Sequence, residues 1–268
     1  MSSPSPSTKP GPPIVRALAL TAALLAACFG VLTVNVVVHD VRAHGAEDHS
    51  GILAADPQIS GWAIEQRTTV LTTLARIVST VGDTLSMTIL ATIVCALLLR
   101  SGDRARAALV AAAGLGAAVI VFGGKRLIGR ERPPAADRLT YEPSLSYPSG
   151  HAVASCVVIA ICAAVFLPRI TRLAVRIVAG LLAAAFVLSV GWSRVYLGVH
   201  WPTDVLGAWC ASIAWVSFCL AVFHYRQRIP GPDHPDAALP ATSRPAAAGL
   251  LSTRVRAERT PPVNHDVP

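Results

Sequence analysis

The stretch SRVYLGVHWPTD, residues 193–204, lies between two apolar runs and brings an Arg, a His and an Asp to their ends. An ionisable side chain beside a segment that is apolar enough to span a membrane is costly, so such residues usually serve a function. The flanking runs are long enough to be spanning helices. We therefore expect Arg194, His200 and Asp204 to lie at one end of a helical bundle, at a functional site.

The composition is that of a membrane protein. Hydrophobic residues make up 53% of the 268 residues and charged residues only 14%, whereas a soluble domain carries about a quarter charged residues. The net charge of +8 would suggest nucleic acid in a soluble protein, but basic residues of membrane proteins gather in cytoplasmic loops. We expect no nucleic-acid partner. The cysteines fall inside apolar runs without metal-ligand spacing, so we expect small buried side chains.

Six apolar runs predict an all-α protein with six transmembrane helices. The runs cover residues 14–38, 83–99, 105–122, 152–167, 173–192 and 203–223. Residues 82–225 form the expected catalytic core, and residues 39–81 an outward loop followed by an amphipathic interfacial helix over 62–80. The Ser- and Pro-rich residues 1–13 and the polar residues 226–268 are expected to be disordered tails.

The distribution of arginines predicts the orientation. They occur between spans two and three, between spans four and five, and after span six: Arg100, Arg104, Arg106, Arg169, Arg172, Arg176, Arg226 and Arg228. The positive-inside tendency places these loops and both termini in the cytoplasm. The loop 123–151 is also basic but then faces outward, and residues that break a placement rule are candidates for function. We expect the site on the extracytoplasmic side of the plasma membrane.

Three polar clusters lie at the outward ends of spans three to six. They are KRLIGRERP at residues 125–133, PSGH at 148–151 and the stretch at 193–204. Together they supply cations, a hydroxyl, free backbone N–H groups and two imidazoles. This inventory suits the binding of a phosphate and an attack on it.

Five residues are candidates for phosphate binding. The planar forks of Arg132 and Arg194 can each hold two phosphate oxygens, and Lys125 adds a point charge. Ser149 stands at the expected N-cap of span four, where its hydroxyl and the amide of Gly150 would form an anion site. The absence of a side chain at Gly150 lets a phosphate approach.

Three residues are candidates for catalysis. Asp204 follows His200 by four residues, in the expected first turn of span six, and could accept a hydrogen bond from one ring nitrogen. The other nitrogen of His200 would then be an unprotonated nucleophile. His151 is left to protonate the departing oxygen.

These clusters resemble the signature of the type 2 phosphatidic acid phosphatase superfamily, the lipid phosphate phosphatases that share a helical core with vanadium haloperoxidases. That signature, Lys-x6-Arg-Pro, Pro-Ser-Gly-His and Ser-Arg-x5-His-x3-Asp, matches here at every fixed position within about residues 120–223. The resemblance implies a phosphohistidine at His200, oriented by Asp204, with His151 as general acid. It assigns the phosphoryl group to Lys125, Arg132, Ser149, Gly150 and Arg194, and it implies no metal or other cofactor.

An outward site at the bilayer surface suits a lipid phosphate whose tail stays in the membrane. Isoprenyl diphosphate, such as undecaprenyl diphosphate, is our first expectation, and phosphatidic acid or phosphatidylglycerol phosphate the second. A phosphotransferase that passes the phosphoryl group to an acceptor other than water is the alternative, since the covalent intermediate permits both. A soluble haloperoxidase relative and a membrane scaffold with an inactive site fit the sequence less well.

Several other polar residues have simpler interpretations. We interpret Arg126, Arg130 and Glu131 as surface charges, with contact to a lipid headgroup as the alternative. The stretch HDVRAHGAEDHS, with its histidines at positions 39, 44 and 49, could bind a metal, but flexible His-containing loops without fixed ligand geometry are common.

Overall fold

The computed structural model describes residues 12–43 and 52–228, and every regular element in these ranges is helical. The α-helices are α1 (Pro12–Ala43), α2 (Ala55–Glu65), α3 (Thr69–Val81), α4 (Thr84–Arg100), α5 (Arg104–Ile128), α6 (Gly150–Phe166), α7 (Leu173–Tyr196) and α8 (Pro202–Arg226). Short 3-10 turns cover Ile52–Ala54, Ala135–Asp137 and Leu167–Arg169. The predicted all-α fold is therefore confirmed. The tails expected at 1–13 and 226–268 lie mostly outside the described residues, as do the histidines at positions 44 and 49 of the possible metal site.

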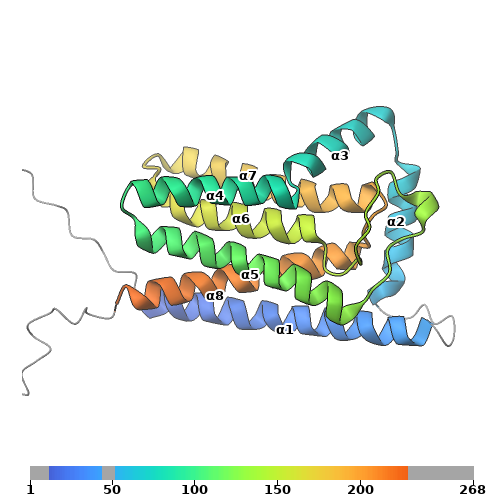
Figure 1. Cartoon of the computed structure of the whole chain (residues 1–268), viewed down its shortest axis with the longest axis horizontal. Coiled ribbons are helices and arrows are strands. Elements are labelled where there is room, and N and C mark those ends of the chain that lie inside the picture. Colours follow the sequence, from blue (N-terminus) through green and yellow to red (C-terminus); the bar gives the residue numbers. More distant parts are fainter. Residues whose placement is uncertain (1–11, 44–51, 229–268) are drawn as a thin grey trace, which may run out of the picture. The chain divides into compact units, whose positions relative to one another are not determined.

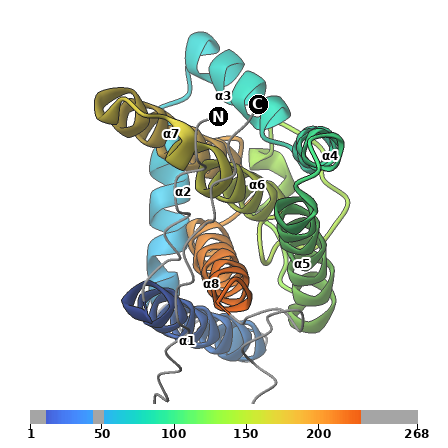
Figure 2. The ribbon, with the colours of Figure 1, turned by 90° about the vertical axis from the view of Figure 1, so that its left-hand side faces the viewer.

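Helix α6 is the centre of the bundle, packed against α4, α5, α7 and α8, while α1 lies along α8 (Figures 1 and 2). Lipid tails are as apolar as the helices, so spanning helices associate through close packing, which small residues permit. Gly191 of α7 is such a residue, because an added Cβ would lie 2.3 Å from the Trp209 ring and 2.7 Å from Val205 of α8.

Five helical segments of the described residues are long and apolar enough to cross a membrane: α1, α5, α6 together with the 3-10 turn that follows it, α7 and α8. Helix α4, at the predicted second span, has 17 residues and meets the same criterion only together with α3, from which it is bent by 42°. The described residues thus contain five candidate spans, or six when the bent pair counts as one.

The segment ahead of α4 differs from the prediction. The expected interfacial helix over 62–80 is divided: α2 ends at Glu65, and α3 begins after Thr68, whose hydroxyl accepts a hydrogen bond from the Leu71 N–H at 3.2 Å. That cap explains the break, because an extended Thr N-cap ends one helix and starts another. Helix α2 also occupies part of the expected outward loop.

A tight turn joins α7 to α8 and fixes the backbone before His200. Gly198 adopts the left-handed conformation with φ 72°, and a Cβ there would lie 2.3 Å from the Asp137 carbonyl oxygen. Arg67 donates to the Tyr196 carbonyl at 2.9 Å and to the Asp137 carbonyl at 2.8 Å. The turn is therefore held by both the α2–α3 connection and the loop 129–149.

Candidate active site

The predicted site residues converge at one end of the bundle. Lys125 lies in the last turn of α5, Arg132 in the loop that follows, and Arg194 in the last turn of α7. His151 lies in the first turn of α6, and Asp204 lies in the first turn of α8. We call this the site end of the bundle, formed by residues 125–151 and 193–204.

His200 is held between an acid and a cation. Its Nδ1 lies 3.3 Å from Asp204 Oδ2, and its Nε2 lies 3.1 Å from Arg132 Nη1. A guanidinium can only donate, so Nε2 is the unprotonated nitrogen and Nδ1 carries the proton toward Asp204. Burial lowers the pKa of His200 to about 3. The imidazole is therefore neutral at physiological pH and presents a lone pair at Nε2.

Asp204 is completely buried and fully hydrogen-bonded. Its Oδ2 accepts hydrogen bonds from the Trp201 N–H at 2.9 Å and from the Ser146 hydroxyl at 2.5 Å. Its Oδ1 accepts one from Arg130 Nη1 at 2.6 Å. A buried carboxylate is tolerated when paired in this way, and these bonds fix the orientation of the oxygen that faces His200.

The cations of the phosphate site are occupied by protein groups. Lys125 Nζ donates to Ser144 Oγ at 2.6 Å, and Arg132 donates to the Ser144 carbonyl, also at 2.6 Å. Arg194 is paired with Glu142, which lies 3.8 Å from Arg132 as well. Burial lowers the pKa of Arg132 to about 10, so it stays charged at neutral pH. The carboxylate of Glu142 therefore lies between two of the predicted phosphate ligands.

Ser149 lies at the N-terminus of α6, where the sequence predicts it. Ser149 is the N-cap, and its hydroxyl is buried with no hydrogen-bond partner among the described residues. A buried hydroxyl without a partner costs free energy, and a bound phosphate oxygen would satisfy it. An added Cβ at Gly150 would meet Val121 at 3.5 Å, an ordinary contact, so packing within the protein does not require this glycine.

Two cavities meet at the site. The larger, of about 650 Å³, is lined at its polar end by Lys125, Arg132, Gly150, His151 and His200, and it continues between the apolar side chains of α4, α5 and α6. A second, of about 450 Å³, contains Arg194 together with polar residues of α3. Glu142 and His151 line both.

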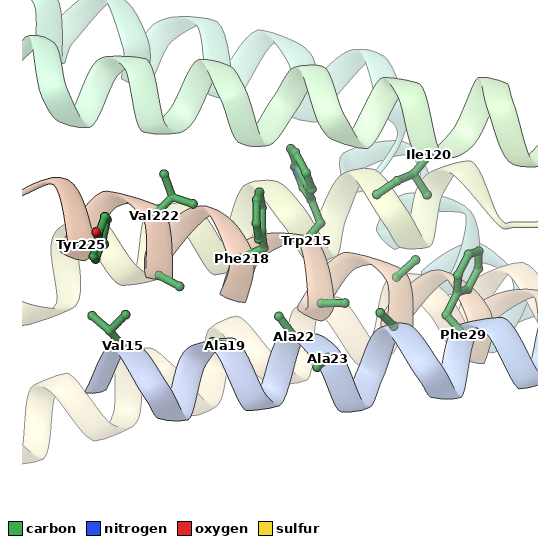
Figure 3. A pocket seen from close by; sticks show the side chains of 14 residues that line it. Val15, Ala19, Ala22, Ala23, Phe29, Ile120, Trp215, Phe218, Val222 and Tyr225 are labelled. Atoms are coloured by element: carbon green, nitrogen blue, oxygen red, sulfur yellow. The ribbon is translucent and has the colours of Figure 1, made fainter. Parts of the chain in front are cut away.

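An apolar cavity of about 710 Å³ lies apart from the site, between α1, α5 and α8 (Figure 3). Its lining includes Phe29, Ile120, Trp215 and Phe218, and it contains none of the predicted site residues. Size alone would thus point away from the chemistry. Within the described residues, no cluster of three or more His, Cys, Asp or Glu side chains is arranged to hold a metal.

The interpretation of Arg130 as a surface charge is wrong. Arg130 is 7% exposed and donates to Asp204 at 2.6 Å and to Asp56 at 2.7 Å. Burial opposes its charge, but the carboxylates of Asp204 and Asp56 outweigh this and raise the pKa of Arg130. An arginine in a polar loop gives no local signal of such burial. Asp56, Glu142 and Ser146 were missed for the same reason.

Part of the chain is similar to known proteins. Residues 104–228 match the model of the PAP2 superfamily. Phosphatidylglycerophosphatase B of Bacillus subtilis (strain 168) is 44% identical over 102 residues, which cover 33% of this chain and 48% of that protein. The chain thus aligns with about half the length of this curated relative.

The fold has a counterpart among solved structures. The first transmembrane PAP2 type phosphatidylglycerolphosphate phosphatase from Bacillus subtilis superposes with a TM-score of 0.63 at 24% identity, covering 78% of this chain and 98% of that one. At this identity the likeness concerns the fold. The PAP2 superfamily model thus matches the segment from α5 to α8, and the helical bundle has the fold of a PAP2 structure.

Proposed function

We propose that this protein hydrolyses lipid phosphates. The observation that carries the proposal is the cavity of about 650 Å³, which joins a cationic pocket with two histidines to an apolar slot between α4, α5 and α6. A phosphate would enter the polar end while its lipid tail follows the slot along the bilayer. The surroundings of such a tail are mostly apolar, which favours a lipid over a water-soluble phosphate ester.

The arrangement supports a two-step mechanism. Nε2 of His200 attacks phosphorus, the bond to the leaving oxygen breaks, and His151 gives that oxygen a proton. Water then attacks the phosphohistidine, His151 accepts a proton from the water, and the N–P bond breaks to release inorganic phosphate. Lys125, Arg132 and Arg194 neutralise the charge on the phosphoryl oxygens.

Phosphatidylglycerol phosphate is the substrate we now place first. The sequence alone put isoprenyl diphosphate ahead, but both similar proteins from Bacillus subtilis are named for phosphatidylglycerol phosphate. The phosphate contacts are common to all these lipids. Isoprenyl diphosphate and phosphatidic acid therefore remain in the panel that must be tested.

The proposal is tested by phosphate release from purified protein in detergent. The panel contains the three lipids and water-soluble glycerol 3-phosphate, with His200→Ala protein as the control for contaminating phosphatases. We expect lipid phosphates to be hydrolysed at least about tenfold more efficiently, since the slot binds only the tail. Equal efficiency on glycerol phosphate would contradict the lipid preference. Adding glycerol as acceptor distinguishes hydrolysis from phosphotransfer.

A variant pair tests the slot directly. Ala118→Trp places a large ring on the wall of the cavity, whereas Val119→Trp changes the neighbouring exposed position outside it. We expect only Ala118→Trp to raise KM for the lipids, with no change on glycerol phosphate. Equal effects of both variants would exclude this slot as the tail site.

We also propose that the site faces outward from the plasma membrane and that both termini are cytoplasmic. The arginine distribution supports this orientation. In a cysteine-free background, Tyr141→Cys, at an 88% exposed position of the site end, should react with an impermeant thiol reagent in intact cells. Ser101→Cys, between α4 and α5, should not. The opposite labelling would show an inverted orientation.

A further inference from the structure

Asp56 is a buried acid that the proposed mechanism does not use. It lies in the first turn of α2, outside the segment matched by the family model, and is 2% exposed. Its Oδ1 accepts a hydrogen bond from the Thr203 N–H at 2.9 Å, and its Oδ2 accepts one from Arg130 Nη2 at 2.7 Å and one from the Thr203 hydroxyl. A carboxylate buried this deeply needs such complete pairing.

The partners of Asp56 lead directly to the nucleophile. Arg130 uses its other terminal nitrogen to donate to Asp204 Oδ1 at 2.6 Å, and Asp204 Oδ2 faces His200 Nδ1 at 3.3 Å. Thr203 immediately precedes Asp204, so its N–H belongs to the free first turn of α8. Asp56 thus holds both the backbone and the side-chain partner of the acid that orients His200.

The charges of this cluster also favour the reaction. One cation, Arg130, lies between two carboxylates, so the group carries a net negative charge. His200 becomes positively charged when Nε2 bonds to phosphorus, and a nearby negative charge stabilises that state. If Asp56 lost its charge, Arg130 would neutralise Asp204, and this stabilisation would weaken.

We propose that Asp56 is a positioning residue for the nucleophile, acting on His200 through Arg130 and Asp204. This inference rests on the proposed phosphatase function. It extends the catalytic apparatus to α2, a helix ahead of the family's matched core.

Asp56→Asn tests the proposal, because the amide can still accept from the Thr203 N–H while the charge is lost. We expect kcat to fall about 10–100-fold, as happens when the hydrogen-bond partner of a metal-binding histidine is lost. KM should stay within about threefold, because the variant changes none of the residues proposed to bind the phosphate. Asp103→Asn is the matched control. Asp103 is the N-cap of α5, at the end of that helix away from Arg130, and the loss of its charge should leave kcat unchanged.

A double-variant cycle separates positioning from mere stability. In an Arg130→Gln background, Asp56→Asn should cause little further loss of kcat, because its effect travels through Arg130. Additive losses in kcat, or a kcat of Asp56→Asn equal to wild type, would overturn the proposal. If Asp56→Asn shows no cooperative thermal transition, Thr203→Val replaces it. That variant removes the hydroxyl that donates to Asp56 and accepts from Arg130, keeps the Thr203 N–H, and should lower kcat severalfold at constant KM.

Binding of inorganic vanadate keeps the test independent of turnover. Vanadate can take an axial nitrogen ligand, whereas sulfate interacts only with the cations. Asp56→Asn should weaken vanadate binding about tenfold, the size seen when a ligating residue loses a hydrogen-bonding neighbour, and should leave sulfate binding unchanged. A wild-type protein that binds vanadate in this manner but releases no phosphate from any lipid would refute the proposed function and not this inference. Equal vanadate affinity of variant and wild type would refute the inference.

Discussion

Helix α5 carries a cluster of opposite charges at each of its ends, and the two clusters differ in burial. At its N-terminal end, Asp103 pairs with Arg106 and Arg169, with side chains 22%, 41% and 44% exposed. Water screens these charges, so pairs of this kind contribute about 0–1 kcal/mol. This end also contains arginines from which the orientation is predicted.

At the other end the composition is reversed, with one arginine between two acids. Arg130 pairs with Asp56 and Asp204, and none of these side chains is more than 9% exposed. Removing one member of a buried group leaves an unpaired charge, which costs about 3–5 kcal/mol. The same residue types are thus screened by water at one end of α5 and form a buried network beside His200 at the other.

The largest expected effect is at the residue that the buried cluster orients. His200→Ala should lose about a thousandfold or more of kcat/KM on every substrate, because nothing replaces the nucleophile. His151→Ala should lose as much on a lipid phosphate, whose alkoxide needs a proton, but recover much of its first-step rate on nitrophenyl phosphate. Phosphate release measures the activity on the lipid phosphate, and nitrophenolate absorbance measures the first step on nitrophenyl phosphate. Activity of His200→Ala on the activated ester, with loss in His151→Ala, would reverse the assigned roles.

The next effect compares the two clusters directly. Arg130→Met leaves two carboxylates unpaired in the interior and should destabilise the fold by about 3–5 kcal/mol, whereas Arg169→Met should cost less than about 1 kcal/mol. Arg130→Lys should recover only part of the loss, since an ammonium lacks the fork that spans two carboxylates. Thermal unfolding in one detergent compares all three. Similar transitions for Arg130→Met and Arg169→Met would show that burial does not distinguish the clusters.

Acid should destabilise the folded protein through His200, the buried side chain that faces Asp204. Burial lowers the pKa of His200 from 6.5 to about 3. As pH falls below 6.5, the unfolded chain binds a proton that folded His200 does not, so this contribution is complete above 6.5 and declines toward pH 3. Between about pH 7.5 and about pH 4.5, wild type should lose on the order of 2–3 kcal/mol more than His200→Gln. Equal losses in thermal unfolding across that range would contradict this prediction.

Sequence reasoning succeeded where the signal is local. Uniform apolar runs predict α6 and α7, and the fixed spacing of PSGH identifies Ser149 and His151 at the start of α6. The pairing of Arg130 with Asp56 joins residues 74 positions apart, and it depends on how α2 packs beside the start of α8. No periodicity or motif reports that contact, so a charge in a polar segment was taken as exposed.

A smaller effect is expected at Glu142, which is paired with Arg194. Because its carboxylate competes with an incoming anion, Glu142→Gln should tighten the inhibition by inorganic phosphate severalfold, by up to about 1 kcal/mol of binding free energy. The inhibition constant of the purified protein measures this. A weaker inhibition would mean that Glu142 supports phosphate binding instead of opposing it.

The smallest effect on the free energy of unfolding should be that of Asp103→Asn, because asparagine keeps the hydrogen bond that caps α5. The Asp103 side chain accepts a hydrogen bond from the Arg106 N–H at 3.1 Å and so caps α5. Its hydrogen bond with the Arg106 side chain holds the pKa of Asp103 below its usual value of 3.8. Asparagine is as good an N-cap as aspartate, so Asp103→Asn removes the charge and keeps the cap. The loss should be below about 1 kcal/mol at low salt and should vanish near 1 M salt, where charges are screened within about 3 Å. A loss that persisted in high salt would place Asp103 in the same class as the buried cluster and remove the contrast between the two ends of α5.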